Sequence, residues 1–505
     1  MGSTAPNILL ILSDQQHFGT LGAVNERIRT PALDRLCAEG TRFDRAYCPN
    51  PTCTPTRASL ITGLYPSQHG AWALGTKLPQ SVPTVGEALK GADYDTALIG
   101  KAHFQPLASR PPWESIECQP TLRDLDFWRN FHGPWYGFEH LETARMHGTE
   151  SHVGGHYALW MQEQGLENWA DYFDSYPVNV ARRGSFDRDG HWTLPERFHY
   201  NRWITQRSVE AIHRAQDRGR PFFLSVNHFD PHPPYVVPKP WASMYRPQDM
   251  APGALTPGEH DRNPRHFAMT QQHDPDFQAF GDAWVHGGHS HLVDRQTLQR
   301  QMAVYYGMVS FMDACIGELL ATLDALGLTE NTLVVFTTDH GHFLGQHGLT
   351  AKAIHHYEDL IRVPMIARWP GRIPAARVSS ALQNLVDYSP TFLAAAGLDV
   401  PEAMTGVNQL PAWQGAGAVR TWSITENHHG RRHFHMRTYV EDRYKITVYA
   451  RGDEGELFDL QEDPAELNNL WSDPAAAPVK SQLLQRFLQA TMQYEHMPMP
   501  RIAGA

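Results

Sequence analysis

Short apolar runs alternate with amphipathic stretches along most of this chain. Four of these runs lie at residues 8–12, 96–99, 222–226 and 333–336. Apolar runs of this length are typical of strands, and strands that alternate with helical patterns are typical of α/β proteins. We therefore expect a mostly parallel central sheet flanked by helices.

Two of the intervening segments have clear helical patterns. Residues 30–40 begin with Thr-Pro and end with Gly, as expected for an N-cap, a first helical position and a C-terminal stop. Apolar residues recur every three or four positions from Met302 to Leu323, which predicts an amphipathic helix of about two dozen residues. Residues 105–200 have little periodicity and are rich in Trp, His and Gly, so we expect long loops around a substrate entrance there.

The sequence pattern changes after residue 397. The stretch 411–418 is the best linker candidate, which predicts a catalytic domain at 1–415 and a C-terminal domain at 416–505. Antiparallel strands and a closing helix are expected in the second domain, at 437–439, 444–449 and 481–494. This domain is therefore predicted to be small and of the α+β class.

Composition limits the function classes. With 505 residues, the chain is longer than one ordinary domain of about 150 residues. Hydrophobic residues make up 41% and charged residues 19%, which excludes disorder as the main state. The net charge of -11 disfavours non-specific binding to nucleic acid or an anionic membrane, so an anionic substrate needs a local cationic pocket.

The cysteines, the first residues and the lengths of the apolar runs indicate a cellular location. The five cysteines include no CxxC pair, so neither a disulfide framework nor a thiolate metal site is indicated. The start lacks the pattern of a signal peptide, and no run approaches the roughly 18 apolar residues of a membrane span. We expect a cytoplasmic protein without a membrane partner, or a periplasmic one if a signal has been removed.

Each of the four apolar runs is followed by polar residues suited to chemistry. They are Asp14 and Gln15, Lys101 and His103, His232, and Asp339 and His340. In an open parallel sheet, ligands bind at the carboxyl ends of the strands. The polarity of loops in general explains one or two such clusters, but four of them favour one shared crevice.

Residues 51–63 are predicted to form a turn followed by a helix, with Pro55 in its first turn and Gly63 at its end. Cys53 then lies at a helix N-terminus, where backbone N–H groups and the helix dipole favour negative charge. Arg57, one turn later, adds a permanent cation. A lone cysteine is most often a small buried residue, and a reactive thiolate is the second interpretation.

The segment Cys53-Thr54-Pro55-Thr56-Arg57 resembles the CxPxR signature of the type I sulfatases of the alkaline phosphatase superfamily. In that family the cysteine is oxidised after translation to formylglycine. Asp14-Gln15 and Asp339-His340 resemble the family's two metal-binding pairs, and Gly100-Lys101-Ala102-His103 resembles its GKxH segment. His232 resembles the family's later histidine, and Lys352 resembles its second lysine. Residues 456–470 resemble its C-terminal domain.

The resemblance implies an alkaline-phosphatase-like fold and hydrolysis of small-molecule sulfate monoesters. A hydrated formylglycine derived from Cys53 would supply the nucleophilic hydroxyl, after maturation by the formylglycine-generating enzyme. One divalent metal would be bound by Asp14, Gln15, Cys53, Asp339 and His340. Oxygen ligands favour Ca²⁺, whereas a nitrogen ligand from His340 makes Mn²⁺ more competitive.

The resemblance also implies roles for the remaining polar residues. Arg57, Lys101 and Lys352 would stabilise negative charge on the transferred group. His103 is our candidate for the base that permits release of sulfate. His232 is the candidate proton donor to the leaving alcohol, with assistance from Lys352.

The metal-binding pairs depart from the pattern of many sulfatases, which have two adjacent acids and then Asp-Asn. Asp-Gln and Asp-His resemble the phosphonate monoester hydrolases and some sugar sulfatases, so hydrolysis of phosphonate monoesters or phosphodiesters is the alternative. Lys101 and His103 favour sulfate, because phosphonate hydrolases carry uncharged hydroxyl residues there. A binding protein without activity would be expected to lack one of the polar groups. Aryl, alkyl and sugar sulfates all remain open as substrates.

Two further predictions concern the histidines and the C-terminus. Seven histidines in Gly-rich segments are expected to line a pocket or lie on the surface, because no carboxylate accompanies them at a fixed spacing. These are His286, His289, His291, His428, His429, His433 and His435. The apolar and weakly charged tail at 483–500 has no evident core of its own to cover, which predicts a homo-oligomer.

Overall fold

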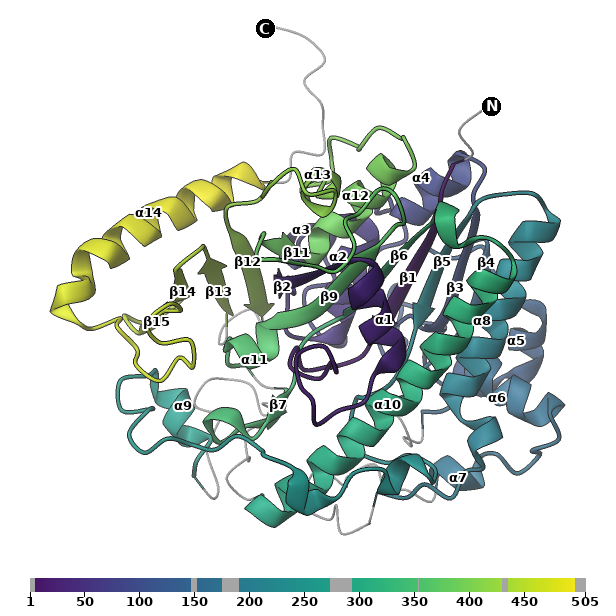
Figure 1. Ribbon diagram of the computed structural model, residues 1–505, viewed down its shortest axis with the longest axis horizontal. Helices are drawn as coiled ribbons and strands as arrows, with labels where there is room; N and C mark the ends of the chain where they lie inside the picture. The colour runs from purple at the N-terminus through teal and green to yellow at the C-terminus, as the bar shows by residue number, and fades with distance from the viewer. Residues whose placement is uncertain are drawn as a thin grey trace, which may run out of the picture.

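The computed structural model describes residues 5–146, 152–174, 190–272, 293–352, 354–428 and 435–495. A large central sheet lies between two layers of helices, and a smaller sheet lies beside it (Figure 1). The expected α/β fold with a mostly parallel sheet is confirmed.

The large sheet has nine strands, eight of them in one path with β11 paired to β2. In spatial order they are β10 (Arg377–Ser379), β2 (Thr41–Tyr47), β9 (Arg362–Arg368), β6 (Thr332–Thr338), β1 (Asn7–Ser13), β5 (Phe222–Asn227), β3 (Asp95–Lys101) and β4 (His140–Ala144), with β11 at Gln383–Asn384. Among the strands that the structure describes in this sheet, only β9 runs antiparallel to its neighbours. The four predicted strands are the adjacent strands β6, β1, β5 and β3, all parallel.

Alternate residues of β1 enter two different cores, which explains its unbroken apolar run. Ile8, Leu10 and Leu12 belong to the core on one face of the sheet. Leu9 and Ile11 belong to the core on the other face. A strand covered on both faces needs apolar residues at every position, and this places its carboxyl end in the interior of the protein.

Helices cover both faces of the large sheet. One face is covered by α1 (Pro31–Glu39), α6 (Gly155–Glu163), α8 (Tyr200–Asp217) and α10 (Arg295–Ala325). The other face is covered by α2 (Cys53–Thr62), α4 (Val85–Gly91) and α12 (Tyr388–Ala395). The predicted helices at 30–40 and 302–323 correspond to α1 and α10. By length and composition α10 could cross a membrane, but 72% of its apolar window is buried inside the protein, as in a core helix.

Shorter elements connect these layers. The short helices are α3 (Pro66–His69), α5 (Leu125–Asn130), α7 (Asp171–Asp174), α9 (Arg265–Met269), α11 (Glu358–Ile361) and α13 (Leu410–Trp413), and a small hairpin is formed by β7 (Phe343–Leu344) and β8 (Thr350–Ala351). The expectation of long loops over 105–200 is partly wrong, because this region contributes β4, α5 and α6. Strand β4 lies at the sheet edge and has the mixed sequence His-Leu-Glu-Thr-Ala, so it lacks the apolar run of a central strand.

The smaller sheet is antiparallel, in the order β12 (Ser423–His428), β13 (His435–Val440), β14 (Tyr444–Tyr449) and β15 (Gly455–Asp459). Helix α14 (Ala477–Gln493) packs Leu483 and Phe487 against it, as predicted for a closing helix. The boundary at 415/416 stays a prediction. Within the proposed linker, α13 packs Trp413 into the core of the larger unit.

Candidate active site

The polar residues that follow the four predicted strands meet at one place. The Lys101 ammonium contacts the Asp14 carboxylate, and the Gln15 backbone N–H donates to Asp339 Oδ1 over 3.0 Å. His232 Nε2 lies 3.2 Å from the ammonium nitrogen of Lys352. The expected convergence at the carboxyl edge of the sheet is therefore observed.

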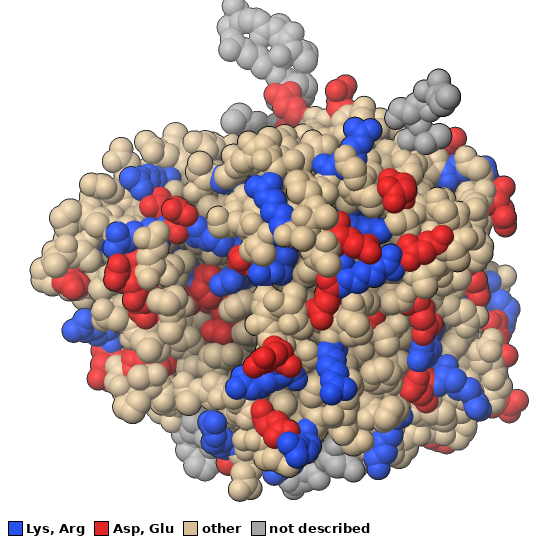
Figure 2. Space-filling view, viewed as in Figure 1, with Lys and Arg blue, Asp and Glu red and all other residues tan. Residues whose placement is uncertain are grey.

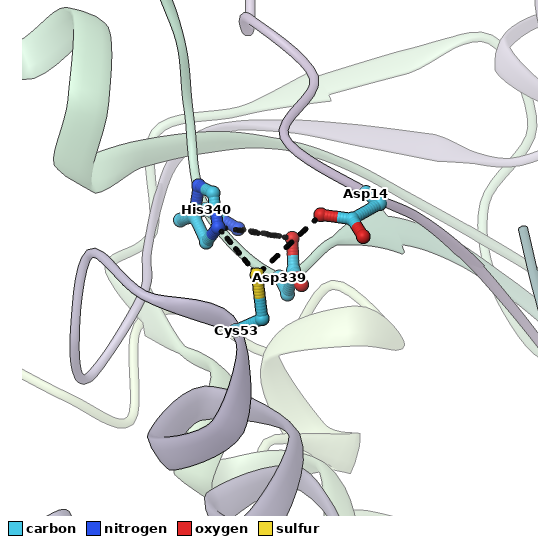
Figure 3. Close-up of side chains that lie close together, drawn as sticks. All are labelled: Asp14, Cys53, Asp339 and His340. Carbon is cyan, nitrogen blue, oxygen red and sulfur yellow. Dashed lines mark hydrogen bonds and ion pairs between the residues drawn. The ribbon is translucent and has the colours of Figure 1, made fainter. Parts of the chain in front are cut away.

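Cys53 lies among these residues at the first position of α2. Its sulfur is 3.1 Å from Lys352 Nζ, 3.3 Å from His340 Nε2 and 3.7 Å from Asp14 Oδ1. Figure 3 shows Asp14, Cys53, Asp339 and His340 pointing toward one another. Burial and Asp14 act to raise the pKa of the Cys53 thiol, but nearby lysine ammonium groups outweigh them and lower it.

Arg57 connects the Cys53 helix to two strand ends. Its Nε donates to Asp339 Oδ2 over 2.8 Å, and its Nη1 donates to the Lys101 carbonyl over 2.9 Å. Arg57 is 2% exposed and Lys101 is fully buried, and such buried charges are tolerated only when they are paired. Burial acts to raise the pKa of Asp14, but the neighbouring cations, Lys101 above all, hold it well below its usual value.

The donor atoms in the site fit a divalent cation. One possible ligand atom each from Asp14, Cys53, Asp339 and His340 lies within 4.8 Å of the others. His340 Nδ1 contacts the Gly341 carbonyl at 3.0 Å and so carries a proton, which leaves Nε2 as a lone pair facing Cys53. These groups are buried carboxylates and an imidazole, which are ordinary metal ligands.

The environment of Gln15 also favours a divalent cation in this site. Its side-chain amide nitrogen lies 2.9 Å from His342 Nδ1, and its side-chain oxygen is buried without a hydrogen-bond partner. Its backbone has a left-handed φ of 62°, and its carbonyl accepts a 2.9 Å hydrogen bond from Tyr305. A strained backbone and an unsatisfied buried oxygen are costly unless the site uses them, and a cation would satisfy that oxygen.

The two candidate proton-transfer histidines lie in different environments. His103 Nε2 is 2.7 Å from an Arg145 guanidinium nitrogen, and because arginine can only donate, His103 is an acceptor at this atom. His232 Nδ1 lies 2.6 Å from the Pro233 carbonyl, so its Nε2 faces Lys352 as a lone pair. Burial lowers the pKa of both histidines, and nearby cations add to this effect.

The sulfatase family profile matches residues 6–398, and this span contains every residue of the site. The chain belongs to the sulfatase family. A second profile, for the C-terminal part of N-sulphoglucosamine sulphohydrolase, matches residues 345–493. Family membership makes this sulfatase an enzyme that hydrolyses sulfate esters, and it implies a divalent metal.

Relatives cover nearly the whole chain. An arylsulfatase of Clostridium perfringens is 28% identical over 92% of this chain and 90% of its own length. The multifunctional alkaline phosphatase superfamily protein PehA of Trinickia caryophylli is also 28% identical, over 96% of this chain and 95% of its own. A solved phosphonate monoester hydrolase from Silicibacter pomeroyi superposes with a TM-score of 0.78 at 24% identity, covering 97% of this chain and 96% of its own, and shows the shared fold.

The structure adds site residues that sequence reasoning missed. Arg145 directly follows the last residue of β4 and is 4% exposed beside His103. His342 orients the side chain of Gln15. The Glu117 carboxylate accepts hydrogen bonds from the backbone of His103, at 2.8 Å, and of Gln105, at 2.6 Å. An arginine directly after a strand can be recognised in a sequence as a candidate site residue. Strand β4 itself was not predicted, so Arg145 was not identified.

Two of the seven histidines that were expected to line a pocket or lie on the surface fall within the described residues. His286, His289, His291, His429 and His433 lie outside the described residues. His428 and His435 face each other across β12 and β13 with ring centroids 3.8 Å apart, and Trp72 lies 6.0 Å from His428. A role for them in a substrate pocket stays a prediction.

The hairpin that leads to Lys352 is held by a buried histidine. His347 lies between β7 and β8 and is 5% exposed. Its Nδ1 is 3.1 Å from a Glu259 oxygen, and its Nε2 is 3.7 Å from an oxygen of Asp359, whose other oxygen binds His17 over 2.8 Å. Asp359 therefore connects the segment after Asp14 to the hairpin before Lys352.

His347 predicts a specific pH dependence of stability. Burial alone would lower its pKa, but the carboxylates of Asp359 and Glu259 raise it to about 9. A folded pKa above the unfolded value of about 6.5 stabilises the protein below pH 6.5, and this contribution of about 3 kcal/mol is lost as the pH rises through 9. Thermal unfolding at pH 6 should therefore separate wild type from His347→Gln by several degrees more than at pH 9.5.

The matched control for this measurement is His213→Gln, because His213 is exposed on α8. It should change the unfolding temperature little at either pH. A difference between wild type and His347→Gln that is equal at both pH values would contradict a charged His347 in the folded protein.

Proposed function

We propose that this sulfatase hydrolyses sulfate monoesters with a formylglycine derived from Cys53 and one divalent metal ion. The observation that carries the proposal is the placement of Cys53, buried at a helix N-terminus within 3.7 Å of Lys352, His340 and Asp14. In the present chain the thiol occupies the position of the oxygen groups of the modified residue. A thiol would be a poor ligand beside hard carboxylate oxygens, whereas hydroxyl groups suit them.

The metal would be held by Asp14, Gln15, Asp339, His340 and residue 53. We propose Ca²⁺, because four of these five residues offer oxygen once Cys53 is oxidised, and Mn²⁺ is the alternative because of the His340 nitrogen. When bound, the ion would lower the pKa of a residue 53 hydroxyl and polarise the sulfate oxygens. Hydrated formylglycine would supply one hydroxyl for attack on sulfur and a second for release of sulfate.

The cations of the site would bind the transferred group. Arg57, Lys101 and Lys352 are all at least 94% buried, and they supply the local positive charge that the chain as a whole lacks. Such fixed donors need no reorganisation when negative charge develops on the sulfate oxygens. This pocket is the expected solution for binding an anion on a protein of net charge -11.

Lys352 and His232 would together protonate the leaving alcohol. Because neutral His232 accepts from Lys352 at Nε2, the proton on this pair resides on the ammonium group. Burial acts to lower the pKa of Lys352, but Cys53 and Asp14 raise it overall. We therefore assign Lys352 as the proton donor and His232 as the residue that positions its ammonium group, which reverses the roles expected for these two residues from the sequence.

His103 remains the proposed base for sulfate release. To accept a proton at Nε2 it has to lose its contact with Arg145, which holds that atom now. Arg145 would then move toward the anionic product while His103 becomes charged. Arg145 is thus a positioning residue for His103 in this proposal.

Lys101 gives a test of charge stabilisation. Lys101→Met should lower kcat/KM for an aryl sulfate by about 10²- to 10³-fold, because one preorganised donor to the transferred group is lost. Lys90→Met, on an exposed position of α4, is the control and should leave turnover unchanged. Retention of full activity by a folded Lys101→Met enzyme would remove Lys101 from the mechanism.

Phosphonate monoester hydrolysis is the second candidate reaction, favoured by the Asp14-Gln15 and Asp339-His340 pairs. Against it, Lys101 and His103 would present a cation and an imidazole to the transferred group; Lys101 contacts Asp14 of the site, and His103 contacts Arg145. We propose that sulfate is preferred. Paired aryl sulfate and aryl phosphonate monoester substrates with the same leaving group test this, and a higher kcat/KM for the phosphonate would reverse the assignment.

Partners and cellular location complete the proposal. The partners would be a small sulfate ester and the formylglycine-generating enzyme, and a cytoplasmic location stays a prediction. Nucleic acid is not an expected partner, and Figure 2 supports this because basic and acidic side chains are interspersed over the face it shows. Aryl, alkyl and sugar sulfates all remain candidate substrates.

We also propose a homo-oligomer that uses α14. Leu484, Leu488 and Met492 follow one another at four-residue intervals and are 36%, 62% and 59% exposed. Such a stripe on a helix is typical of a surface covered by another subunit. Light scattering should show an oligomer at micromolar concentration, and Leu488→Glu should shift it toward monomer, while Gln485→Glu should not. A wild-type monomer at this concentration would contradict the proposal.

A further inference from the structure

A cluster of two histidines and one glutamate lies on the outer edge of the large sheet. His140 and Glu142 are alternate residues of β4, so their side chains point to the same side of the strand. His132 comes from the segment after α5, and its carbonyl accepts a 2.8 Å hydrogen bond from the Leu141 backbone. This contact holds His132 beside the other two residues.

The cluster is separate from the catalytic centre. His140 begins β4, whereas Ala144 ends it, next to Arg145 and the active site. Four residues of extended strand span about 13 Å. Among the described residues, β4 pairs only with β3, so the other side of β4 is not covered by a further strand.

The three side chains are arranged around one point. Glu142 Oε1 lies 3.1 Å from His132 Nδ1 and 3.8 Å from His140 Nε2. The two imidazole rings are parallel within 2°, with centroids 5.4 Å apart. One ligand atom from each residue lies within 4.8 Å of the other two. The Glu142 side chain is 7% exposed and the rings are 39% and 25% exposed, so the cluster opens toward solvent on the histidine side.

The charges suit a cation. Burial acts to raise the pKa of Glu142, but the contact with His132 and the nearby His156 and Arg207 together outweigh it and lower the pKa to about 2, so the carboxylate is ionised. Burial and a nearby arginine lower the pKa of His140 to about 4, which leaves a neutral imidazole. Contact with Glu142 raises the pKa of His132. A metal ion that binds here would compete with a proton for the His132 imidazole.

We propose that His132, His140 and Glu142 bind a Zn²⁺ ion at a site distinct from the catalytic metal. Two imidazole nitrogens and one carboxylate oxygen are a common zinc ligand set, and water would complete the tetrahedron. Ca²⁺ prefers sites in which oxygen ligands predominate, as at the catalytic centre, whereas two of the three ligands here are nitrogens, so Zn²⁺ would bind here and Ca²⁺ at the catalytic centre.

The surrounding residues leave the ligand atoms in place. Arg207 Nε lies 3.7 Å from the other oxygen of Glu142, and Arg207 also donates to Glu210 over 2.7 Å, so the ion need not displace it. Both nitrogens of His156 are engaged, one with the Thr143 backbone N–H and one with the Phe131 carbonyl. His156 therefore supports the His132 segment and is not a fourth ligand.

Zinc at this site would join the segment after α5 to β4 and stabilise the folded protein, because the unfolded chain has no such arrangement. It would not enter the hydrolysis of the sulfate ester. The site would thus be a structural one, with occupancy that falls at acidic pH as protons compete for His132.

The test uses the full-length enzyme with excess Ca²⁺ present. Zn²⁺ is titrated against a chromophoric chelator, and Co²⁺ is used to record the visible spectrum of the bound ion. Wild type should bind one Zn²⁺ that His140→Ala does not bind, and Zn²⁺ should raise the unfolding temperature of wild type alone. His132→Gln should bind Zn²⁺ at least about tenfold more weakly. Sulfate ester turnover should be unchanged in both variants.

His213→Ala is the matched control, since His213 is an exposed histidine on α8. If His140→Ala folds poorly, His132→Gln carries the test alone, because His132 lies outside the strand and is partly exposed. Equal Zn²⁺ stoichiometry and affinity in wild type and the folded variants would overturn the proposal. Loss of Zn²⁺ only in His340→Ala would also overturn it, because the ion would then occupy the catalytic site.

Discussion

Replacing Cys53 by alanine should lower the turnover of a sulfate ester by about 10⁴- to 10⁶-fold, the loss expected when a covalent nucleophile is removed. Alanine cannot be converted to formylglycine, and it cannot supply a hydroxyl in its place. The fold should survive, because only one sulfur atom is removed from a site whose other contacts are ion pairs and hydrogen bonds. The measurement is kcat with an aryl sulfate, together with the unfolding temperature.

Cys48→Ala is the control for this variant. Cys48 is as fully buried as Cys53, but the contact its sulfur makes is with the Leu360 carbonyl at 3.9 Å. It should lose some stability and retain turnover. Activity of Cys53→Ala within tenfold of wild type would show that Cys53 is not the source of the nucleophile.

Asp339→Asn is expected to have the second largest effect, a loss of at least about 10³-fold in turnover together with loss of the bound metal. One Asp339 oxygen accepts the backbone N–H groups of Gln15 and His340, and the other accepts from Arg57. An asparagine can satisfy the two backbone groups, but its NH₂ would then face the Arg57 donor. The change therefore removes a metal ligand and leaves a buried guanidinium without its closest partner.

Elemental analysis and kinetics on the same sample separate these effects from unfolding. Asp313→Asn is the control, because the equally buried Asp313 carboxylate accepts from the Ala32 and Leu33 backbone at the start of α1, outside the site. It should lower the unfolding temperature without changing metal content or turnover. A folded Asp339→Asn enzyme that keeps both its metal and its activity would exclude Asp339 as a ligand.

The four central strands could be predicted from sequence because each is covered on both faces and so needs an unbroken apolar run. Two other strands lack this signal. Strand β9 contains Pro364, and a proline argues against a central strand because it donates no ladder hydrogen bond. Strand β4 is an edge strand with charged residues, so neither it nor Arg145 beyond it was identified.

The site residues could be predicted because each directly follows a predicted strand or belongs to a recognisable motif. The hydrogen-bonded states of these residues could not be predicted from the sequence. The free oxygen of Gln15 depends on His342, and the acceptor atom of His103 depends on Arg145. These partners are distant in sequence, so only the folded chain brings them together.

The most direct test of the account is the mass of the peptide that contains Cys53, measured on enzyme that actively hydrolyses an aryl sulfate. We expect formylglycine at residue 53, seen as the replacement of the thiol by an aldehyde or its hydrate, in a fraction of molecules that rises in proportion to specific activity. A homogeneous, fully active sample in which every Cys53 is an unmodified thiol would contradict it.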